Sequence, residues 1–162
     1  IEGAPLARTA IVSARGQIVE LACDVPPQRS VLCDGDIYLS PRDDGRVLVG
    51  STLEFVGFRT GVTASAIARL LGAAARLLPA LGEAEVTRFW SSFRPHTQDE
   101  LPYIGESGFR NVWLASGHFR NGILLSGITA DCLAALMAGH APPLELEAFS
   151  GTRVSPAPSS RS

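Results

Sequence analysis

The stretch at residues 113–125 reads Trp113-Leu114-Ala115-Ser116-Gly117-His118-Phe119-Arg120-Asn121-Gly122-Ile123-Leu124-Leu125, an apolar run that breaks into glycine and polar residues and then resumes. This pattern predicts a strand, a tight turn and a helix that begins near Asn121 and Gly122. The segment 123–137 is apolar or small apart from Ser126, Thr129 and Asp131. We therefore expect a helix that is buried on every side. Its first turn would present free N–H groups and roughly half a positive charge, which suits an electron-rich or anionic ligand. A buried helix with an ordinary turn is the alternative.

The composition indicates a globular chain with one hydrophobic core. It has 162 residues, 46% of them hydrophobic, which is enough to bury such a core. The net charge is -2, with 14 Lys+Arg against 16 Asp+Glu, so we expect neither a nucleic acid nor a membrane as a partner. The sequence has no run of about 18 apolar residues and no signal-peptide pattern, and the expected location is cytoplasmic.

Histidine, acidic and cysteine residues do not indicate a metal site. The histidines lack metal-ligand spacing, and the acidic residues form no paired-carboxylate motif. The cysteines form no CxxC pair, and we expect all of them to be reduced residues of the core. They are Cys23, Cys33 and Cys132.

Strand patterns occupy the first fifty residues. We expect strands over residues 10–13 and 17–21, separated by a turn or bulge at Arg15-Gly16. A hairpin should follow, in which residues 36–42 and 47–52 pair across the turn Asp43-Asp44-Gly45.

Tyr38 lies within this hairpin. It stands between Ile37 and Leu39, so its ring should point to the sheet face opposite theirs. A tyrosine hydroxyl on a covered face needs a polar partner. A core or surface tyrosine is the alternative to a functional one.

A one-faced amphipathic helix should begin after Thr63, its N-cap, and end before or shortly after Pro79. Packing is its expected role. An aromatic strand over residues 85–93 follows, and shorter segments at 101–105 and 111–115 lead into the central turn.

Arg94 ends this aromatic strand, beside the rigid Pro95. The planar fork of a guanidinium group matches a carboxylate better than any other side chain. A solvated surface arginine is the alternative.

Four motifs follow one another along the chain: Tyr38-x-x-Pro41-Arg42, Gly45-Arg46-x-x-x-Gly50-Ser51-Thr52, Arg94-Pro95-x-Thr97-x-Asp99-x-x-Pro102-x-Ile104-Gly105 and Gly117-His118-Phe119-Arg120-Asn121-Gly122-Ile123-Leu124. In order and spacing they resemble the glycine oxidase (thiamine-biosynthesis type) and D-amino acid oxidase family of FAD enzymes. The match runs from about Arg15 to about Phe149. It departs from the family at Ser92, where a glycine is frequent, and this leaves the size of the substrate open.

The resemblance implies an α+β fold with a mixed β-sheet substrate domain flanked by helices. Residues 1–110 would belong to this domain, residues 111–150 would form the strand and helix that return to an FAD-binding domain, and residues 151–162 would be a disordered tail. The sequence starts without Met and has no GxGxxG after a strand. We therefore expect the N-terminal Rossmann part to be absent and the isolated chain to be inactive.

The resemblance also implies a reaction for the full-length parent: oxidation of glycine or a small D- or N-methyl amino acid to the imine, by hydride transfer to flavin and reoxidation by O2. Arg94 would pair with the substrate carboxylate, Tyr38 would donate its hydroxyl to the same carboxylate or border the site, and Arg120 would lie near the substrate. The flavin contacts would come from His118, Phe119, Arg120, Asn121, Gly122, Ile123 and Leu124. The missing N-terminal half would bind most of the FAD and would be the partner of this chain. Substrate orientation would suffice, without a side-chain base.

A non-catalytic binding or assembly module that keeps the fold without a cofactor is the second hypothesis. The missing GxGxxG favours it for the isolated chain, whereas Tyr38, Arg94 and Arg120 favour the oxidase for the parent protein. The identity of the substrate and a homo-oligomeric state stay open.

Overall fold

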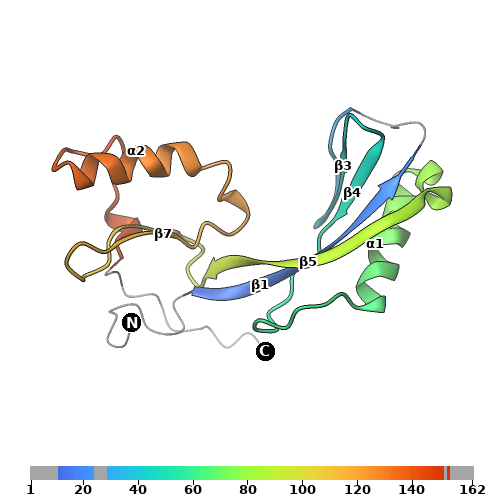
Figure 1. The fold of residues 1–162 in the computed structure, drawn as a ribbon, viewed down its shortest axis with the longest axis horizontal. Helices are drawn as coiled ribbons and strands as arrows, with labels where there is room; N and C mark the ends of the chain where they lie inside the picture. The colour runs from blue at the N-terminus through green and yellow to red at the C-terminus, as the bar shows by residue number, and fades with distance from the viewer. Residues whose placement is uncertain (1–10, 24–28, 152, 154–162) are drawn as a thin grey trace. The chain divides into compact units, whose positions relative to one another are not determined.

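A computed structural model describes residues 11–23, 29–151 and 153 (Figure 1). The chain divides into two compact units, which we describe separately. The sheet unit comprises Ala14–Phe93, and the C-terminal unit comprises Arg94–Ser162 together with Ile1–Ser13.

The sheet unit is built on a five-stranded sheet with the strand order β2-β3-β4-β1-β5. The strands span Ile11–Ala22 (β1), Leu32–Asp34 (β2), Ile37–Pro41 (β3), Arg46–Gly50 (β4) and Glu85–Thr97 (β5). The pairs β2–β3, β3–β4 and β1–β4 are antiparallel, and the expected mixed sheet is therefore replaced by an antiparallel one. Short turns join β2 to β3 and β3 to β4, and such turns can connect only antiparallel neighbours.

The hairpin predicted across Asp43-Asp44-Gly45 is confirmed as β3 and β4. At Arg15-Gly16 the predicted turn is wrong, since β1 is one continuous strand there. The alternative, a bulge, is compatible with the pairing, which shifts by one residue between Arg15↔Glu54 and Ile18↔Gly50. The main chain of Arg15 exchanges two hydrogen bonds with that of Glu54, at 2.9 and 3.0 Å. This pairing holds the backbone extended where the sequence alone suggested a turn.

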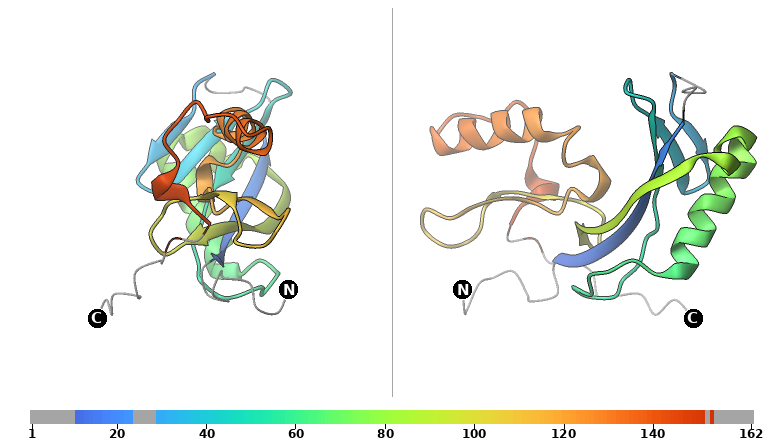
Figure 2. Two further views of the ribbon diagram at one scale, coloured as in Figure 1. Left: turned by 90° about the vertical axis from the view of Figure 1, so that its left-hand side faces the viewer. Right: turned by 45° about the vertical axis from the view of Figure 1, so that its right-hand side comes forward.

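Helix α1, Ala64–Leu77, packs its buried face on this sheet (Figure 2). As predicted, Thr63 caps its N-terminus by accepting a hydrogen bond from the N–H of Ala66, and the helix ends before Pro79. A short 3-10 helix, Pro79–Glu83, follows it. The core joins one face of α1 to alternating strand residues; its members include Leu70, Ala73 and Ala74 from the helix and Val19, Leu21, Leu39, Val47 and Val49 from the sheet.

Tyr38 faces away from this core, as predicted, whereas its neighbours Ile37 and Leu39 are buried in it. Its ring lies against Gly50, its partner on the adjacent strand. A Cβ at Gly50 would be 2.7 Å from the phenol oxygen of Tyr38. The glycine is therefore required for the ring to lie flat on the sheet.

The C-terminal unit contains a two-stranded sheet, a turn and helix α2 (Figure 1). Strands β6, Tyr103–Glu106, and β7, Trp113–Ser116, are antiparallel. After β7 come a 3-10 turn, Phe119–Asn121, then α2, Ser126–Met137, and a last 3-10 turn, Glu147–Phe149. Gly139, directly after the C-cap Ala138 of α2, has a positive φ of 75°, which suits a glycine at a helix end.

Helix α2 begins four residues later than expected. Its N-cap is Leu125, which offers no side-chain cap, rather than Asn121 or Gly122. Residues 119–125 form turns first, in which the N–H of Asn121 donates to the carbonyl of His118 at 2.9 Å and that of Ser126 to the carbonyl of Ile123 at 3.3 Å. These bonds join residues three apart, as in turns and 3-10 helices, rather than four apart as in an α-helix.

The prediction that this helix is buried on every side is wrong for the described residues. Only Thr129 and Cys132 are buried within α2, because β6 and β7 cover one side of it. Ile123 and Leu124, just before the helix, are 93% and 80% exposed, and Met137 near its end is 62% exposed. An apolar surface is thus left open along the turn and the helix.

The cysteines also differ from expectation. Cys132 is buried and Cys23 is half-buried, but Cys33 is exposed. Cys33 lies on the edge strand β2, where Leu32 takes the side that faces the core and Cys33 takes the other.

No described helix is long and apolar enough to cross a membrane. In the same part of the chain, no group of His, Cys, Asp and Glu side chains could hold a metal ion.

Arg153 anchors the end of the described chain to the loop before β6. Its guanidinium donates to both carboxylate oxygens of Asp99, at 2.7 and 3.1 Å, and to the carbonyl of Pro102 at 3.0 Å. It also lies 3.7 Å from the ring centre of Tyr103. Arg153 and Gly151, which is buried, stand within the segment that was expected to be disordered; residues 152 and 154–162 lie outside the described residues.

We expect Arg153→Leu to lower the free energy of unfolding by about 2 kcal/mol at pH 7, because charge-assisted hydrogen bonds to a largely buried carboxylate are lost. The hydrogen bond from Arg153 holds the pKa of Asp99 below its ordinary value. The stabilisation is therefore complete above about pH 4, the unfolded-state value, and disappears as the pH falls through the lower folded-state pKa.

Chemical denaturation of both proteins at pH 7 and in strong acid measures this difference. Arg110→Leu is the matched control, because Arg110 is exposed in the same unit. An equal loss of stability at both pH values would contradict the role given to Asp99.

Candidate active site

The turn after β7 is held against the end of β5 by one close approach. Gly117 is buried and has a φ of 86°, a conformation that suits glycine. A Cβ there would lie 2.6 Å from the methyl group of Thr97, which is fully buried and donates its hydroxyl to the carbonyl of Leu101 at 2.9 Å. The close approach allows His96 and His118 to pair as an isolated β-bridge.

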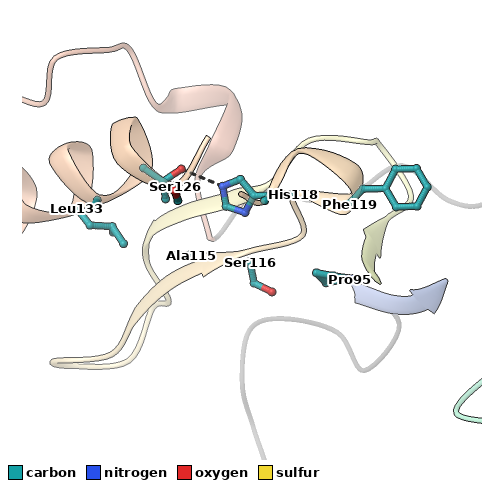
Figure 3. A pocket seen from close by; sticks show the side chains of 10 residues that line it. Pro95, Ala115, Ser116, His118, Phe119, Ser126 and Leu133 are labelled. Atoms are coloured by element: carbon teal, nitrogen blue, oxygen red, sulfur yellow. Dashed lines mark hydrogen bonds between the residues drawn. The ribbon is translucent and has the colours of Figure 1, made fainter. Parts of the chain in front are cut away.

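His118 ties this turn to α2. Its Nε2 lies 3.0 Å from the hydroxyl oxygen of Thr129, and the tautomer decides which of the two donates (Figure 3). Burial lowers the pKa of His118, because the charged imidazolium loses hydration. The ring is therefore neutral near pH 7 and fixed in orientation.

A cavity of about 420 Å³ opens beside these residues, between the turn, β7 and α2 (Figure 3). Its wall is mostly apolar, with hydroxyl groups and one imidazole as the polar part. The lining residues are Pro95, Ala115, Ser116, His118, Phe119, Gly122, Ser126, Thr129, Ala130 and Leu133. A cavity that is mainly apolar with a few polar groups is typical of cofactor and small-molecule sites.

Phe119 brings the two arginines of the predicted site together. The guanidinium carbon of Arg94 lies 6.0 Å from the centre of its ring, and that of Arg120 lies 5.3 Å from it. The ring of His96 meets the same phenyl ring edge to face, with 5.0 Å between the centroids.

The structure places Arg94 inside β5, three residues before its end, and not at the end of the strand as expected. The strand continues because His96 pairs with His118. Tyr38 lies in the other unit, where its ring covers Gly50. The roles assigned to these side chains stay predictions.

The segment His118–Leu124, predicted to contact the flavin, forms one continuous turn at the edge of the cavity. Ile123 and Leu124 are exposed, and among the described residues their N–H groups have no main-chain acceptor. The free N–H groups expected before the helix are thus present, although α2 starts only at Ser126.

Sequence reasoning missed Thr129, Thr97 and His96 as residues that support this turn. One signal for Thr129 was available, because a hydroxyl in an otherwise apolar helix needs a partner when it is buried. Thr97 and His96 act through contacts with Gly117 and Phe119, about twenty residues away in the sequence, and no local pattern indicates such pairs.

Comparison with known proteins decides the family. The model of the DAO family, described as FAD-dependent oxidoreductases, matches residues 2–136. The chain belongs to this family. The resemblance drawn from the four motifs is thereby confirmed.

Individual relatives agree with this assignment. The chain is 40% identical to the glycine oxidase of Pseudomonas aeruginosa over 138 residues, which are 83% of this chain and 37% of that enzyme. It is 44% identical to the bifunctional protein ThiO/ThiG of Synechocystis over 127 residues, which are 78% of this chain and 19% of that protein. The crystal structure of glycine oxidase from Geobacillus kaustophilus superposes with a TM-score of 0.85 at 34% identity, covering 90% of this chain and 40% of that one. The chain thus spans two fifths or less of the length of these relatives.

The residues of the turn fit a flat cofactor ring of the kind FAD carries. The cavity wall is largely apolar, and Gly122 contributes no side chain to it. The exposed N–H groups of Ile123 and Leu124 can donate to an electron-rich edge. That residues His118–Leu124 hold the isoalloxazine stays a prediction.

We expect Thr129→Val to lower the free energy of unfolding by about 1 kcal/mol, because it keeps the shape of the side chain but removes the partner of His118. Thr129→Ser keeps the hydroxyl, so its free energy of unfolding should fall less than that of Thr129→Val. In the unaltered protein, His118 should titrate below about pH 6.5, the value of an unperturbed imidazole. The stability gained from its neutral form is present above that pH and is lost as the pH falls through the lower folded-state pKa.

Denaturation of the two variants and NMR titration of the His118 ring test this expectation. Ser126→Ala is the control, because Ser126 is exposed and its hydroxyl donates to the carbonyl of Ile123 in its own turn. A titration midpoint at or above about 6.5 would show that His118 is hydrated and not buried against α2.

Proposed function

We propose that this chain is the C-terminal part of an FAD-dependent amino-acid oxidase that converts glycine, or a small D- or N-methyl amino acid, to the imine. Electrons would pass to the flavin as a hydride, and O2 would reoxidise it. One observation supports this most directly: the guanidinium groups of Arg94 and Arg120 gather around a single ring, that of Phe119, at the edge of the cavity. Two cations beside an apolar cavity suit a small carboxylate.

Arg94 is proposed to bind the substrate carboxylate through two parallel hydrogen bonds, and Arg120 to lie beside the same group. Tyr38 is proposed to donate its hydroxyl to the carboxylate from the sheet unit. A bidentate contact sets the direction of the substrate as well as its affinity, and orientation is the main requirement of the reaction. When bound, FAD supplies the acceptor for the hydride.

His118 and Thr129 would keep the flavin-contacting turn in one conformation. The imidazole is half-buried and its pKa is lowered by desolvation, which favours the neutral form near pH 7. The N–H groups of Ile123 and Leu124 would stabilise negative charge that develops on the bound cofactor. No side-chain base is needed if the substrate amine arrives deprotonated.

The rest of the parent polypeptide is the proposed partner of this chain. The apolar surface of the turn and α2, with Ile123, Leu124 and Met137 exposed, supports this, as does the greater length of the relatives. An FAD-binding N-terminal half that packs there would bury this surface and provide most contacts to FAD.

The isolated chain should bind FAD weakly or not at all, because the contacts to adenosine and pyrophosphate belong to the proposed N-terminal half. Calorimetric titration of the purified chain with FAD measures the affinity. The full-length parent is the positive control. Binding by the isolated chain at about micromolar affinity or tighter would contradict this division of the site.

In the full-length parent, Arg94→Ala should weaken a carboxylate inhibitor such as acetate by about 2–5 kcal/mol, because an enclosed carboxylate loses its main partner. Arg94→Lys keeps the charge but not the planar fork, so its affinity for acetate should lie between those of the unaltered parent and Arg94→Ala. Flavin absorbance reports inhibitor binding, and anaerobic bleaching by glycine, sarcosine or D-alanine reports the reaction.

Arg110→Ala serves as the control, since Arg110 is an exposed arginine of the same unit. Unchanged acetate affinity in Arg94→Ala would refute the carboxylate role of Arg94. Loss of flavin from the same variant would show that Arg94 is a structural residue. A parent protein that binds flavin but is bleached by no amino acid would favour the non-catalytic module.

A further inference from the structure

Phe119 has a backbone conformation that needs an explanation. Its φ of 51° is left-handed, a region that bulky residues rarely adopt and that costs free energy. Such strain persists only where the surroundings determine the position of the residue. For Phe119 the surroundings are the two histidines of the β-bridge, His96 and His118, and the cavity wall.

The strained backbone directs the phenyl ring to three side chains. The ring of His96 meets it edge to face at an interplanar angle of 90°, which is a favoured aromatic geometry. The guanidinium groups of Arg94 and Arg120 lie 6.0 and 5.3 Å from its centre, within the range of cation–π attraction. His96 thus supports the ring, and the ring contacts both cations.

We propose that Phe119 is a positioning residue that holds the Arg94 and Arg120 guanidinium groups around one small carboxylate. The negative face of the aromatic ring attracts each of the two guanidinium groups. It also limits the rotamers of two long side chains before the ligand arrives. The proposal rests on the proposed function, in which Arg94 binds the substrate carboxylate, and it assigns the Phe119 ring to the substrate rather than to the flavin.

The full-length parent, loaded with FAD, is the protein for the test, and acetate is the probe. In Phe119→Leu, the dissociation constant for acetate should rise about tenfold, since two cation–π contacts are lost. The affinity for FAD should fall by a much smaller factor than the affinity for acetate, because the other residues of the turn keep their proposed flavin contacts. For glycine as substrate, KM should rise by a similar factor while kcat changes much less, because the loss affects binding of the carboxylate throughout the reaction. Phe119→Tyr keeps the aromatic ring and should recover most of the acetate affinity that Phe119→Leu loses.

Phe149→Leu is the matched control, because Phe149 is a half-buried phenylalanine of the same unit outside the cavity. Acetate affinity in Phe119→Leu equal to that in the control would overturn the proposal. Parallel loss of FAD and acetate affinity would also overturn it, by showing that the ring serves the flavin or the turn as a whole. If Phe119→Leu does not fold, Phe119→Met provides the same test with an unbranched apolar side chain.

If the proposed function itself is wrong, the acetate titrations give a different result. In that case Arg94→Ala binds acetate as tightly as the unaltered protein, whatever happens in the Phe119 variants. If Arg94→Ala loses acetate affinity and Phe119→Leu does not, only the positioning role is refuted.

Discussion

The close approach of Gly117 to Thr97 is the contact on which the candidate site depends. A Cβ at Gly117 would overlap the Thr97 methyl group, at 2.6 Å, so the two segments can meet only because the turn begins with glycine. This contact brings the end of β5 to the end of β7 and lets His96 pair with His118. This contact therefore fixes where the turn begins that contains Phe119 and leads to α2.

Successive side chains of the turn then serve different neighbours. His118 is bonded to Thr129 of α2, and Phe119 contacts the arginines and His96. The left-handed backbone at Phe119 separates the two directions, which a regular helix would not do, because adjacent helical side chains diverge by only about 100°. The free energy cost of this conformation is offset by contacts on both sides of the turn. A site for a small acid and a contact surface for a cofactor can therefore share a few consecutive residues.

Apolar side chains around α2 remain exposed because the strands of the C-terminal unit cover one side of it. A chain that is 46% hydrophobic can build a core, and the sheet unit does so between α1 and the strands. In the C-terminal unit, β6 and β7 cover one side of α2, while Ile123, Leu124 and Met137 stay open. Large exposed apolar surfaces usually mark contacts with further polypeptide or a ligand, which agrees with the length of the relatives.

The sequence by itself determined those helix ends and turns that depend on residues close together in the chain. Thr63 and Pro79 define the ends of α1, the Asp43-Asp44-Gly45 turn defines the β3–β4 hairpin, and both were predictable because capping and turn chemistry act within a few residues. Motif order was also sufficient to identify the family. Only the tertiary structure decided the rest: β1 continues through Arg15 because Glu54 pairs with it, and residues 119–125 form turns before α2 starts. The meeting of Arg94, Arg120 and His96 at one ring likewise depends on contacts between distant residues, whose energies no local periodicity records.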